Sequence, residues 1–237
     1  MARNIALRDK EGFRAMAADF QDLRTKMVDN QIRTTDVTDL AVIDAFLTVP
    51  REAFVPAARQ VLAYIDEDQL LESEGKQPRY LMEPSPFAKL VQLASIKNTD
   101  VVLDVGCGTG YSSAILSKLA GSVIGLESDS VLSAAATARL AELGYDNVVI
   151  VSGELQAGYP SEAPYDVIVI EGAVDFIPDA LLAQLRDGGR LVAVEGRGNA
   201  GVARIYVKEN GVASGRGVFN TAVRPLPGFE RIPQFEF

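Results

Sequence analysis

The chain has 237 residues, 48% of them hydrophobic, which suffices for one large core or for a core with an appendage. Its formal net charge of −9 argues against a broad nucleic-acid interface, because such interfaces need clustered Lys and Arg to neutralise phosphates. The absence of histidine excludes Ser-His-Asp and Cys-His nucleophile systems and histidine-ligated metal sites, so we predict no metal cofactor.

Features of secreted and membrane proteins are also missing from the sequence. The single cysteine, Cys107, cannot form an internal disulfide. Residues 1–20 carry charges throughout, without the apolar core of a signal peptide, and no run approaches the roughly 20 apolar residues of a membrane span. We therefore predict a cytoplasmic protein with neither a membrane nor a nucleic-acid partner.

The N-terminal region is predicted to be helical. Apolar side chains recur there at spacings of three and four, which forms one face of an amphipathic helix: Phe13, Met16, Phe20, Leu23 and Met27. We expect this face either to pack on the rest of the domain or to make a homodimer contact. A second helix is predicted over 37–47, before Pro50, and a third over 85–94 with Pro86 near its start. Between the second and third helices, residues 66–83 are polar without a clear period, which predicts a loop or a lid.

From residue 100 onward the pattern changes to short apolar runs. Five Val/Ile-rich runs end in glycine or acidic residues: TDVVLDVG, SVIGLES, NVVIVSG, YDVIVIEG and GRLVAVEG. Helical patterns at 111–120, 129–143 and 178–186 alternate with them, which predicts a parallel sheet covered on both faces. After residue 200, two strands joined at Asn210-Gly211 predict an antiparallel hairpin.

The predicted fold is α/β: a doubly wound, mostly parallel sheet with a helical N-terminal extension and a C-terminal antiparallel hairpin. Residues 1–99 form the helical region and a loop near the site, and residues 100–237 form the sheet domain. No flexible linker separates the two, so we expect one structural unit.

The glycine-rich segment LDVGCGTGY follows a predicted strand and opens a helix, where doubly wound sheets bind nucleotides. Gly106 and Gly108 allow a tight turn and close approach of a ligand, although a turn without any ligand is the alternative. A dinucleotide motif starting at Gly106 would need glycine where Tyr111 stands, and no P-loop motif occurs.

Carboxylates follow three successive strands beside this loop. Asp104 lies two positions before the first glycine, Glu127 ends the second strand and Glu154 follows the third. A carboxylate at the end of the second strand can accept both ribose hydroxyls of a nucleotide. Each carboxylate alone could be a solvated charge, but three beside a glycine loop predict a nucleotide-like ligand.

Asp104 with Gly106, Gly108 and Gly110 resembles motif I of the class I S-adenosylmethionine-dependent methyltransferases. The resemblance implies that the loop holds the amino-acid part of S-adenosyl-L-methionine and that Asp104 assists its ammonium group. It also implies that Glu154 accepts from the adenine amino group while the backbone N–H of Leu155 meets the ring. Two further residues are expected around this cofactor: Ser128 and Glu171.

A narrower resemblance covers residues 27–200. Five segments are similar, in order and spacing, to signature segments of the protein-L-isoaspartate O-methyltransferases: Met27-Val28, Gln31-Ile32, VPREAFVP at 49–56, AYID at 63–66 and APYD at 163–166. That family methylates the carboxylate of L-isoaspartyl residues in damaged proteins. A carboxylate is already ionised at neutral pH, so such a reaction needs positioning and no general base, which suits a chain without histidine.

The chain departs from the family before its third helix. The family has a G-Q-T-I-S-x-P segment there, whose serine hydroxyl lies at the transfer site. A register on Pro84 puts Met82 in the serine's place, and a register on Gly75 puts Arg79 there. Neither register supplies a hydroxyl, so no catalytic residue is assigned.

Glu171, at the end of the fourth strand, is a second departure, because the family usually has a small or hydroxyl residue there. In a partly dry site it would repel a substrate carboxylate by about 1–4 kcal/mol, unless it caps a helix or faces solvent. Three hypotheses follow: an isoaspartyl-type methyltransferase acting on a protein or peptide, a methyltransferase with another acceptor such as a small molecule, or a non-catalytic cofactor-binding adaptor.

Overall fold

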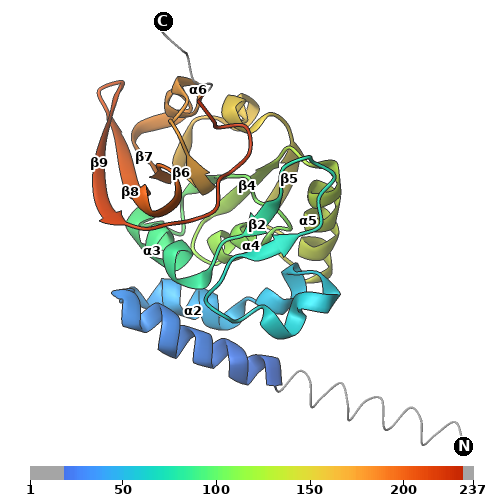
Figure 1. Ribbon diagram of the computed structural model, residues 1–237. Helices are drawn as coiled ribbons and strands as arrows, with labels where there is room; N and C mark the ends of the chain where they lie inside the picture. Colours follow the sequence, from blue (N-terminus) through green and yellow to red (C-terminus); the bar gives the residue numbers. More distant parts are fainter. Residues whose placement is uncertain (1–18, 232–237) are drawn as a thin grey trace, which may run out of the picture.

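The computed structural model describes residues 19–231, and its centre is a seven-stranded sheet of order β5-β4-β3-β6-β7-β8-β9 (Figure 1). The first five strands in that order run parallel, and β8 and β9 continue the sheet antiparallel. The bounds are β3 Val101–Val105, β4 Ser122–Glu127, β5 Val148–Ser152, β6 Tyr165–Val174, β7 Leu185–Glu195, β8 Val202–Glu209 and β9 Val212–Asn220. The predicted doubly wound sheet with a C-terminal hairpin is confirmed.

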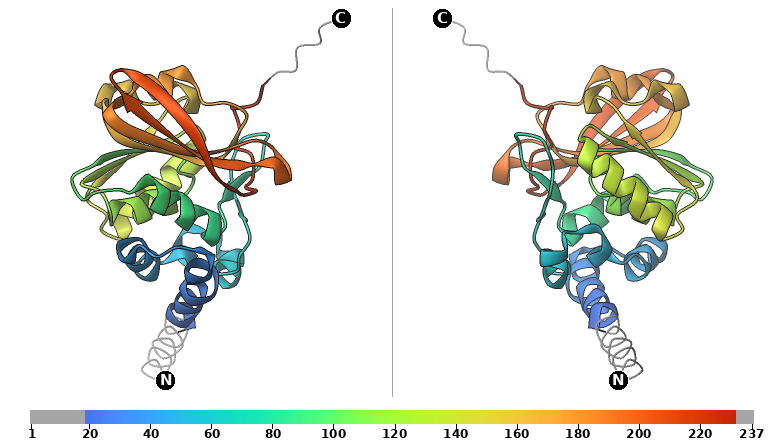
Figure 2. Two further views of the ribbon diagram at one scale, coloured as in Figure 1. Left: turned by 90° about the vertical axis from the view of Figure 1, so that its left-hand side faces the viewer. Right: turned by 90° about the vertical axis from the view of Figure 1, so that its right-hand side faces the viewer.

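Helices cover the two faces of this sheet unequally (Figure 2). One face packs against α3 (Pro84–Ala94), α4 (Tyr111–Ser117) and α5 (Ser130–Glu142), and the N-terminal helices join the same apolar cluster. The other face packs against the short α6 (Asp179–Ala183), the η5 turn (Leu155–Ala157) and the C-terminal segment through Leu226 and Phe229. Alternate residues of β3 point to opposite clusters, as the pleat requires.

The N-terminal region lies beneath the sheet's thicker helical layer. Residues 19–27 are helical and continue into a π-helical turn, η1 (Val28–Ile32), and η2 (Arg33–Thr35). Met27 is buried and Phe20 and Leu23 pack against the core, whereas Phe13 and Met16 lie outside the described residues. Among residues 19–231, no helix combines the length and apolar character needed to cross a membrane.

The ends of the helices are set by capping residues rather than by the apolar pattern from which the helices were predicted. The second helix, α2 (Leu40–Thr48), begins after Asp39, whose carboxylate accepts from the backbone N–H groups of Ala41 and Val42 at 2.8 and 3.3 Å. The predicted helix over 178–186 is shorter, because β7 already begins at Leu185. Two 3-10 turns follow α2: η3 (Arg51–Phe54) and η4 (Ala57–Leu62).

Residues 66–83, predicted as a loop or lid, contain a short antiparallel hairpin of β1 (Gln69–Leu71) and β2 (Arg79–Leu81). Gln69, Leu71, Arg79 and Leu81 point inward and are buried. Strands of three residues are too short to show a period, and two of the four inward positions carry polar side chains. The hairpin forms a sheet of its own in front of β4 (Figure 1).

Candidate functional site

The glycine loop joins β3 to α4 in a conformation that only glycine adopts easily. Gly106, Gly108 and Gly110 have φ angles of 84°, 58° and 94°, a region that β-carbons disfavour. The N–H of Gly106 donates to the carbonyl of Leu126 at 2.8 Å, which fixes the loop against the end of β4. The three predicted glycines therefore form one rigid turn at the carboxyl edge of the sheet.

Asp104 is fully buried beneath this turn. The hydroxyls of Ser112 and Ser113, at the start of α4, donate to its Oδ2 at 2.7 and 2.6 Å. Its Oδ1 is buried and has no hydrogen-bond partner among the described residues. Burial raises the pKa of Asp104 to about 7, and the charge of Glu127 adds to this effect. The free oxygen is an acceptor for which residues 19–231 supply no donor.

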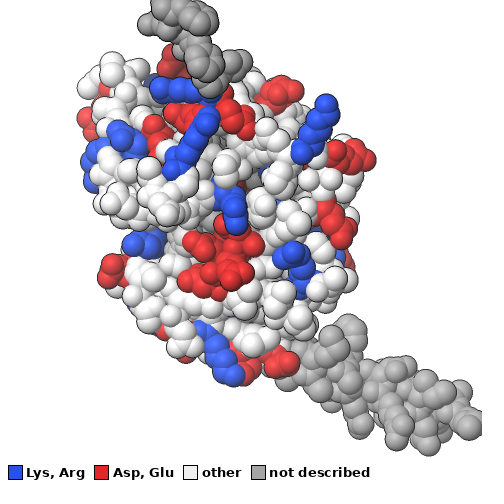
Figure 3. Space-filling model, in the orientation of Figure 1, with Lys and Arg blue, Asp and Glu red and all other residues white. Residues whose placement is uncertain are grey.

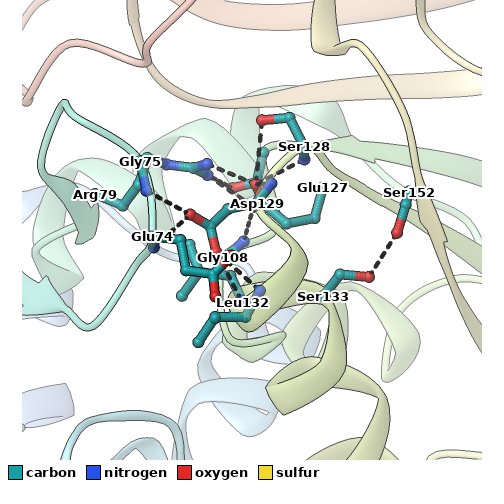
Figure 4. Close-up of polar contacts among 12 residues, drawn as sticks. Glu74, Gly75, Arg79, Gly108, Glu127, Ser128, Asp129, Leu132, Ser133 and Ser152 are labelled. Carbon is teal, nitrogen blue, oxygen red and sulfur yellow. Dashed lines mark hydrogen bonds and ion pairs between the residues drawn. The ribbon is translucent and has the colours of Figure 1, made fainter.

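Glu127 is fully buried at the end of β4, and a set of N–H groups surrounds its carboxylate. Arg79 makes a bidentate ion pair with it, at 2.6 Å from Oε1 and 2.8 Å from Oε2. The backbone N–H groups of Gly108, Ser128 and Asp129 donate to the same carboxylate at 2.8, 2.8 and 3.0 Å. Figure 4 shows Arg79 reaching from the hairpin to Glu127.

The tip of the hairpin is tied to the start of α5. One oxygen of Asp129 accepts from the backbone N–H groups of Glu74 and Gly75 at 2.8 and 3.0 Å. The other oxygen caps α5 by accepting from Val131 and Leu132 at 3.0 and 3.1 Å. Asp129 thus serves the hairpin and the helix at the same time (Figure 4).

Apolar side chains lie directly on the glycine loop. A β-carbon at Gly106 would be 2.8 Å from Cδ1 of Leu226, and one at Gly108 would be 3.0 Å from Cδ1 of Leu71. Leu226 is held there because the segment around it pairs with β6: its N–H donates to the carbonyl of Ala173 at 2.9 Å. The C-terminal segment and β1 therefore both contact the loop.

The remaining predicted cofactor residues lie around the ends of β4 and β5. Glu154 is exposed after β5 and Leu155 is buried behind it. Ser128 is exposed next to Glu127. The structure thus gathers Asp104, Glu127 and the glycines at one edge of the sheet, with Gly108 bonded to Glu127, and leaves Glu154 exposed.

Glu171 lies on β6 (Tyr165–Val174), close to the β1–β2 hairpin. It lines a small cavity of about 10 Å³ together with Asp68, Arg79, Tyr80, Met82 and Leu226. Its Oε1 is buried without a hydrogen-bond partner among the described residues. Burial and the charge of Asp104 raise the pKa of Glu171 well above its usual range. Both candidates for the serine's place, Met82 and Arg79, border this cavity.

Arg51, from the VPREAFVP segment, is a second buried ionisable side chain, next to the backbone of Met82. Its guanidinium donates to the carbonyls of Ala63 and Met82 at 2.6 and 2.7 Å and stacks over the Tyr111 ring at 4.9 Å. Its Nη1 has no partner within residues 19–231, and burial lowers the pKa of Arg51. Arg51 therefore fixes the backbone at Met82.

Acidic side chains gather in the middle of the face shown in Figure 3, with a basic side chain directly above them. Near the hairpin, burial together with the charges of Asp68 and Asp66 raises the pKa of Glu83 to about 7. Asp68 accepts from the N–H of Glu83 at 3.1 Å and lies 3.6 Å from Arg224. Acidic side chains therefore cluster beside the hairpin, and their mutual repulsion contributes to the raised pKa of Glu83.

Sequence reasoning missed three contributors to this site. They are the ion pair of Arg79 with Glu127, the contact of Leu226 with the glycine loop, and the hydrogen bonds of Asp129 to the hairpin tip, which we call the tip latch. Arg79 and Glu127 are 48 positions apart, and no local pattern predicts their contact. The sequence could have predicted Asp129 as the N-cap of α5. It could not have predicted that the second carboxylate oxygen of Asp129 accepts from the hairpin.

Comparisons with known proteins identify what the chain is similar to. A family model described as protein-L-isoaspartate(D-aspartate) O-methyltransferase matches residues 22–228. A protein-L-isoaspartate O-methyltransferase of Rhodopseudomonas palustris is 39% identical over 166 residues, covering 70% of this chain and 74% of the relative. Protein-L-isoaspartate O-methyltransferase 2 of Pelobacter propionicus is 36% identical over 209 residues, covering 87% and 91%.

Solved structures agree in fold. One named protein-L-isoaspartate O-methyltransferase has a TM-score of 0.74 at 26% identity, and the match covers 86% of this chain and 66% of that one. A Plasmodium falciparum structure, titled as the same kind of enzyme in complex with S-adenosyl-L-homocysteine, has a TM-score of 0.70 at 20% identity and covers 87% and 97%. The second likeness concerns the fold alone.

Proposed function

The chain belongs to the protein-L-isoaspartate(D-aspartate) O-methyltransferase family, and we propose that it holds S-adenosyl-L-methionine on loop 104–110 and transfers its methyl group to a carboxylate. It is a methyltransferase by family, so the open questions are which residues serve the cofactor and which acceptor is used. The observation that carries the proposal is the unpartnered Oδ1 of the buried Asp104, beside three glycines with positive φ.

The residues at the loop fit this cofactor chemically. The free Oδ1 of Asp104 suits an ammonium donor, and the glycines leave a cradle that β-carbons would fill. Glu127 would accept from the ribose hydroxyls once its pair with Arg79 is released. Glu154 and the N–H of Leu155 are proposed for the adenine, with Ser128 and Glu171 nearby.

The proposed chemistry requires little of the protein beyond positioning. When bound, the cofactor supplies a methyl group on a positively charged sulfur. An acceptor carboxylate is ionised at neutral pH, so the chain holds it in line and excludes water, without removing a proton. The backbone at Met82, fixed by Arg51, and the cavity beside Glu171 are where we propose that the acceptor lies.

The acceptor side differs from what an isoaspartyl substrate would favour, since Met82 and Arg79 supply no hydroxyl. The expected repulsion between Glu171 and a substrate carboxylate depends on whether Glu171 is ionised. Asp104 already has two hydroxyl donors, and the pKa of Glu171 is raised, so Glu171 is the carboxyl that keeps its proton. A neutral Glu171 repels a carboxylate less than an ionised one. We therefore propose weak isoaspartyl activity, with the missing hydroxyl as the main cause, and retain another protein, peptide or small-molecule acceptor as the alternative.

Isothermal titration with S-adenosyl-L-homocysteine tests the cofactor assignment. We expect binding, and Glu127→Ala should weaken it by about 1.5–3 kcal/mol, the range for hydrogen bonds to a charged group. Glu142→Ala, on the exposed surface of α5, is the matched control and should leave affinity unchanged. Tighter binding of NAD than of the S-adenosyl ligand would contradict the assignment.

Methyl transfer from labelled S-adenosyl-L-methionine tests the acceptor. An isoaspartyl peptide and its aspartyl counterpart are compared with a panel of cell extracts. Strong labelling of another class of acceptor, with the isoaspartyl peptide near background, would favour the divergent enzyme. Cofactor binding without transfer to anything would favour the adaptor.

Two further predictions concern the whole protein. The homodimer contact through the N-terminal helix stays a prediction. Residues 19–27 pack on the core through Met27 and Phe20, so a dimer would use the other face of this helix. Light scattering at several concentrations decides between monomer and dimer. The cytoplasm remains our predicted compartment, and fractionation of cells expressing the chain checks it.

A further inference from the structure

We infer that the β1–β2 hairpin is a gate over the cofactor site and that Arg79 holds it shut by occupying Glu127. The inference rests on the proposed function, because it assigns Glu127 to the ribose. It goes beyond that function by naming a residue of this chain that competes with the cofactor.

The acceptor capacity of Glu127 is already used. A carboxylate offers about four acceptor positions on its two oxygens. Arg79 donates twice and the backbone at Gly108, Ser128 and Asp129 donates three times, all within 3.0 Å. Two ribose hydroxyls therefore cannot be added to this arrangement, and some donor must leave.

Arg79 is the donor that can leave. The three backbone donors belong to the glycine loop and to the start of α5, whose positions are set by the sheet and the helix cap. Arg79 lies on a separate two-stranded hairpin with strands of three residues each. Such a hairpin is marginally stable by itself, so it can move without disturbing the main sheet.

The same movement would clear the hairpin side of the glycine loop. Leu71, on the first strand of the hairpin, lies against Gly108, and Nη2 of Arg79 donates to the carbonyl of Gly106 at 3.2 Å. These two side chains cover the loop on the hairpin side. Both belong to the hairpin, so one displacement of the hairpin removes these two contacts, while Leu226 of the C-terminal segment stays against Gly106.

The released guanidinium would need new partners, and the cavity of about 10 Å³ beside Arg79 would have to widen as the hairpin opens. Arg79 lines the small cavity on the acceptor side together with Asp68 and Glu171, two carboxyl groups on different elements. The hairpin would then have two alternative sets of partners, which is what a two-state element needs. Cofactor entry would move a positive charge from the ribose side toward the acceptor side.

The tip latch keeps the closed state populated. Asp129 accepts from the N–H groups of Glu74 and Gly75, and the Ser130 hydroxyl donates to the Glu74 carboxylate at 3.0 Å. If the closed state holds about 90–99% of the molecules, the apparent affinity for the ligand falls about 10- to 100-fold. Releasing either the Arg79 pair or the latch should recover part of that loss.

The test is titration of wild type and Arg79→Gln with S-adenosyl-L-homocysteine, followed by stopped-flow association. Glutamine keeps a polar side chain but loses the ion pair, so we expect about 10- to 100-fold tighter binding and a faster association rate. Unchanged or weaker binding by folded Arg79→Gln, while wild type binds, overturns the gate and leaves the proposed function intact.

Because removal of one partner of a buried ion pair can destabilise the fold, a second variant is needed. Asp129→Asn keeps an oxygen to cap α5 but presents an amide donor to the N–H groups of Glu74 and Gly75, which breaks the latch. We expect faster association and tighter binding than wild type. Asp39→Asn is the matched control, because Asp39 caps α2 in the same way without touching the hairpin.

The outcomes separate the two proposals. An increase for Asp129→Asn but not for Asp39→Asn supports the gate, and equal behaviour of both variants contradicts it. If neither wild type nor any folded variant binds the ligand at millimolar concentration, the proposed function fails and the gate fails with it.

Discussion

The ends of strands β4 and β6 each place a glutamate beside the glycine loop, and the protein treats the two in opposite ways. Glu127 on β4 is surrounded by N–H donors and paired with Arg79. Glu171 on β6 has a buried oxygen without a partner among residues 19–231, and burial raises its pKa. Two buried carboxyl groups at neighbouring strand ends thus differ in whether the described residues supply them with hydrogen-bond donors.

This difference divides the site into a complete half and an incomplete half. On the β4 side every acceptor of Glu127 is used, so a ligand there must replace an existing contact. On the β6 side Glu171, Tyr111 and Arg51 each keep a buried polar atom unpaired in the described part of the chain. Unpaired buried groups cost stability, and they persist where a ligand or a reaction uses them.

The largest effect on stability is expected for Arg51→Ala, which removes the hydrogen bonds that hold the backbone on the β6 side of the site. The change leaves the buried carbonyls of Ala63 and Met82 without donors and creates a cavity beside Tyr111. We expect a loss of about 3–5 kcal/mol in the free energy of unfolding, measured by urea titration.

Arg33→Ala is the control for this measurement, because Arg33 is exposed and its pair with Asp29 is worth about 0.3–0.5 kcal/mol. Circular dichroism and tyrosine fluorescence should give one coincident transition, since we propose that the helical N-terminal region and the sheet unfold together. Two separate transitions would show that the regions before and after residue 100 unfold as independent units.

A second, smaller effect concerns the acceptor. Met82→Ser combined with Glu171→Thr should raise isoaspartyl methylation, by up to about 10²-fold if the missing hydroxyl misplaces the substrate. Affinity for S-adenosyl-L-homocysteine should change less than the transfer rate, because neither side chain hydrogen-bonds to Glu127 or Asp104, although Glu171 and Asp104 interact electrostatically. Measuring each single variant shows how much each substitution adds to the isoaspartyl methylation rate, and we expect Met82→Ser to add most. Wild-type turnover equal to that of an ordinary family member would show that another residue supplies the contact.

The smallest effect tests the protonation of Asp104. Its pKa of about 7 means that the acceptor for an ammonium group is lost as pH falls, so affinity for S-adenosyl-L-homocysteine should drop about tenfold from pH 8 to pH 6. Titration calorimetry across this range measures it. Asp104→Asn should bind weakly with a flat profile, and an equally steep profile in that variant would assign the pH dependence elsewhere.

The same group affects unfolding with the opposite sign. The folded-state pKa of Asp104 lies above the value of about 3.9 in an unfolded chain, so its proton stabilises the folded state. This contribution is complete below about pH 4 and is lost as pH rises through 7. Thermal melting of wild type and Asp104→Asn over that window separates this contribution from other groups.

The sequence by itself determined the sheet, the glycine loop and the family. Continuous apolar runs of β3 and β6 set the parallel strands, and the loop at 106–110 needs glycine wherever φ is positive. These features depend on neighbours along the chain, so their patterns are local. The carboxylates near the end of β3 and at the end of β4 were found for the same reason, although their roles stay predictions.

Only the tertiary structure decided what surrounds those carboxylates. Arg79 reaches Glu127 across 48 positions, and Leu226 reaches Gly106 because the C-terminal segment pairs with β6. The hairpin that carries Arg79 has strands of three residues, too short for a periodic signal. Contacts between distant segments depend on how the whole core packs, and no local pattern of residues encodes them.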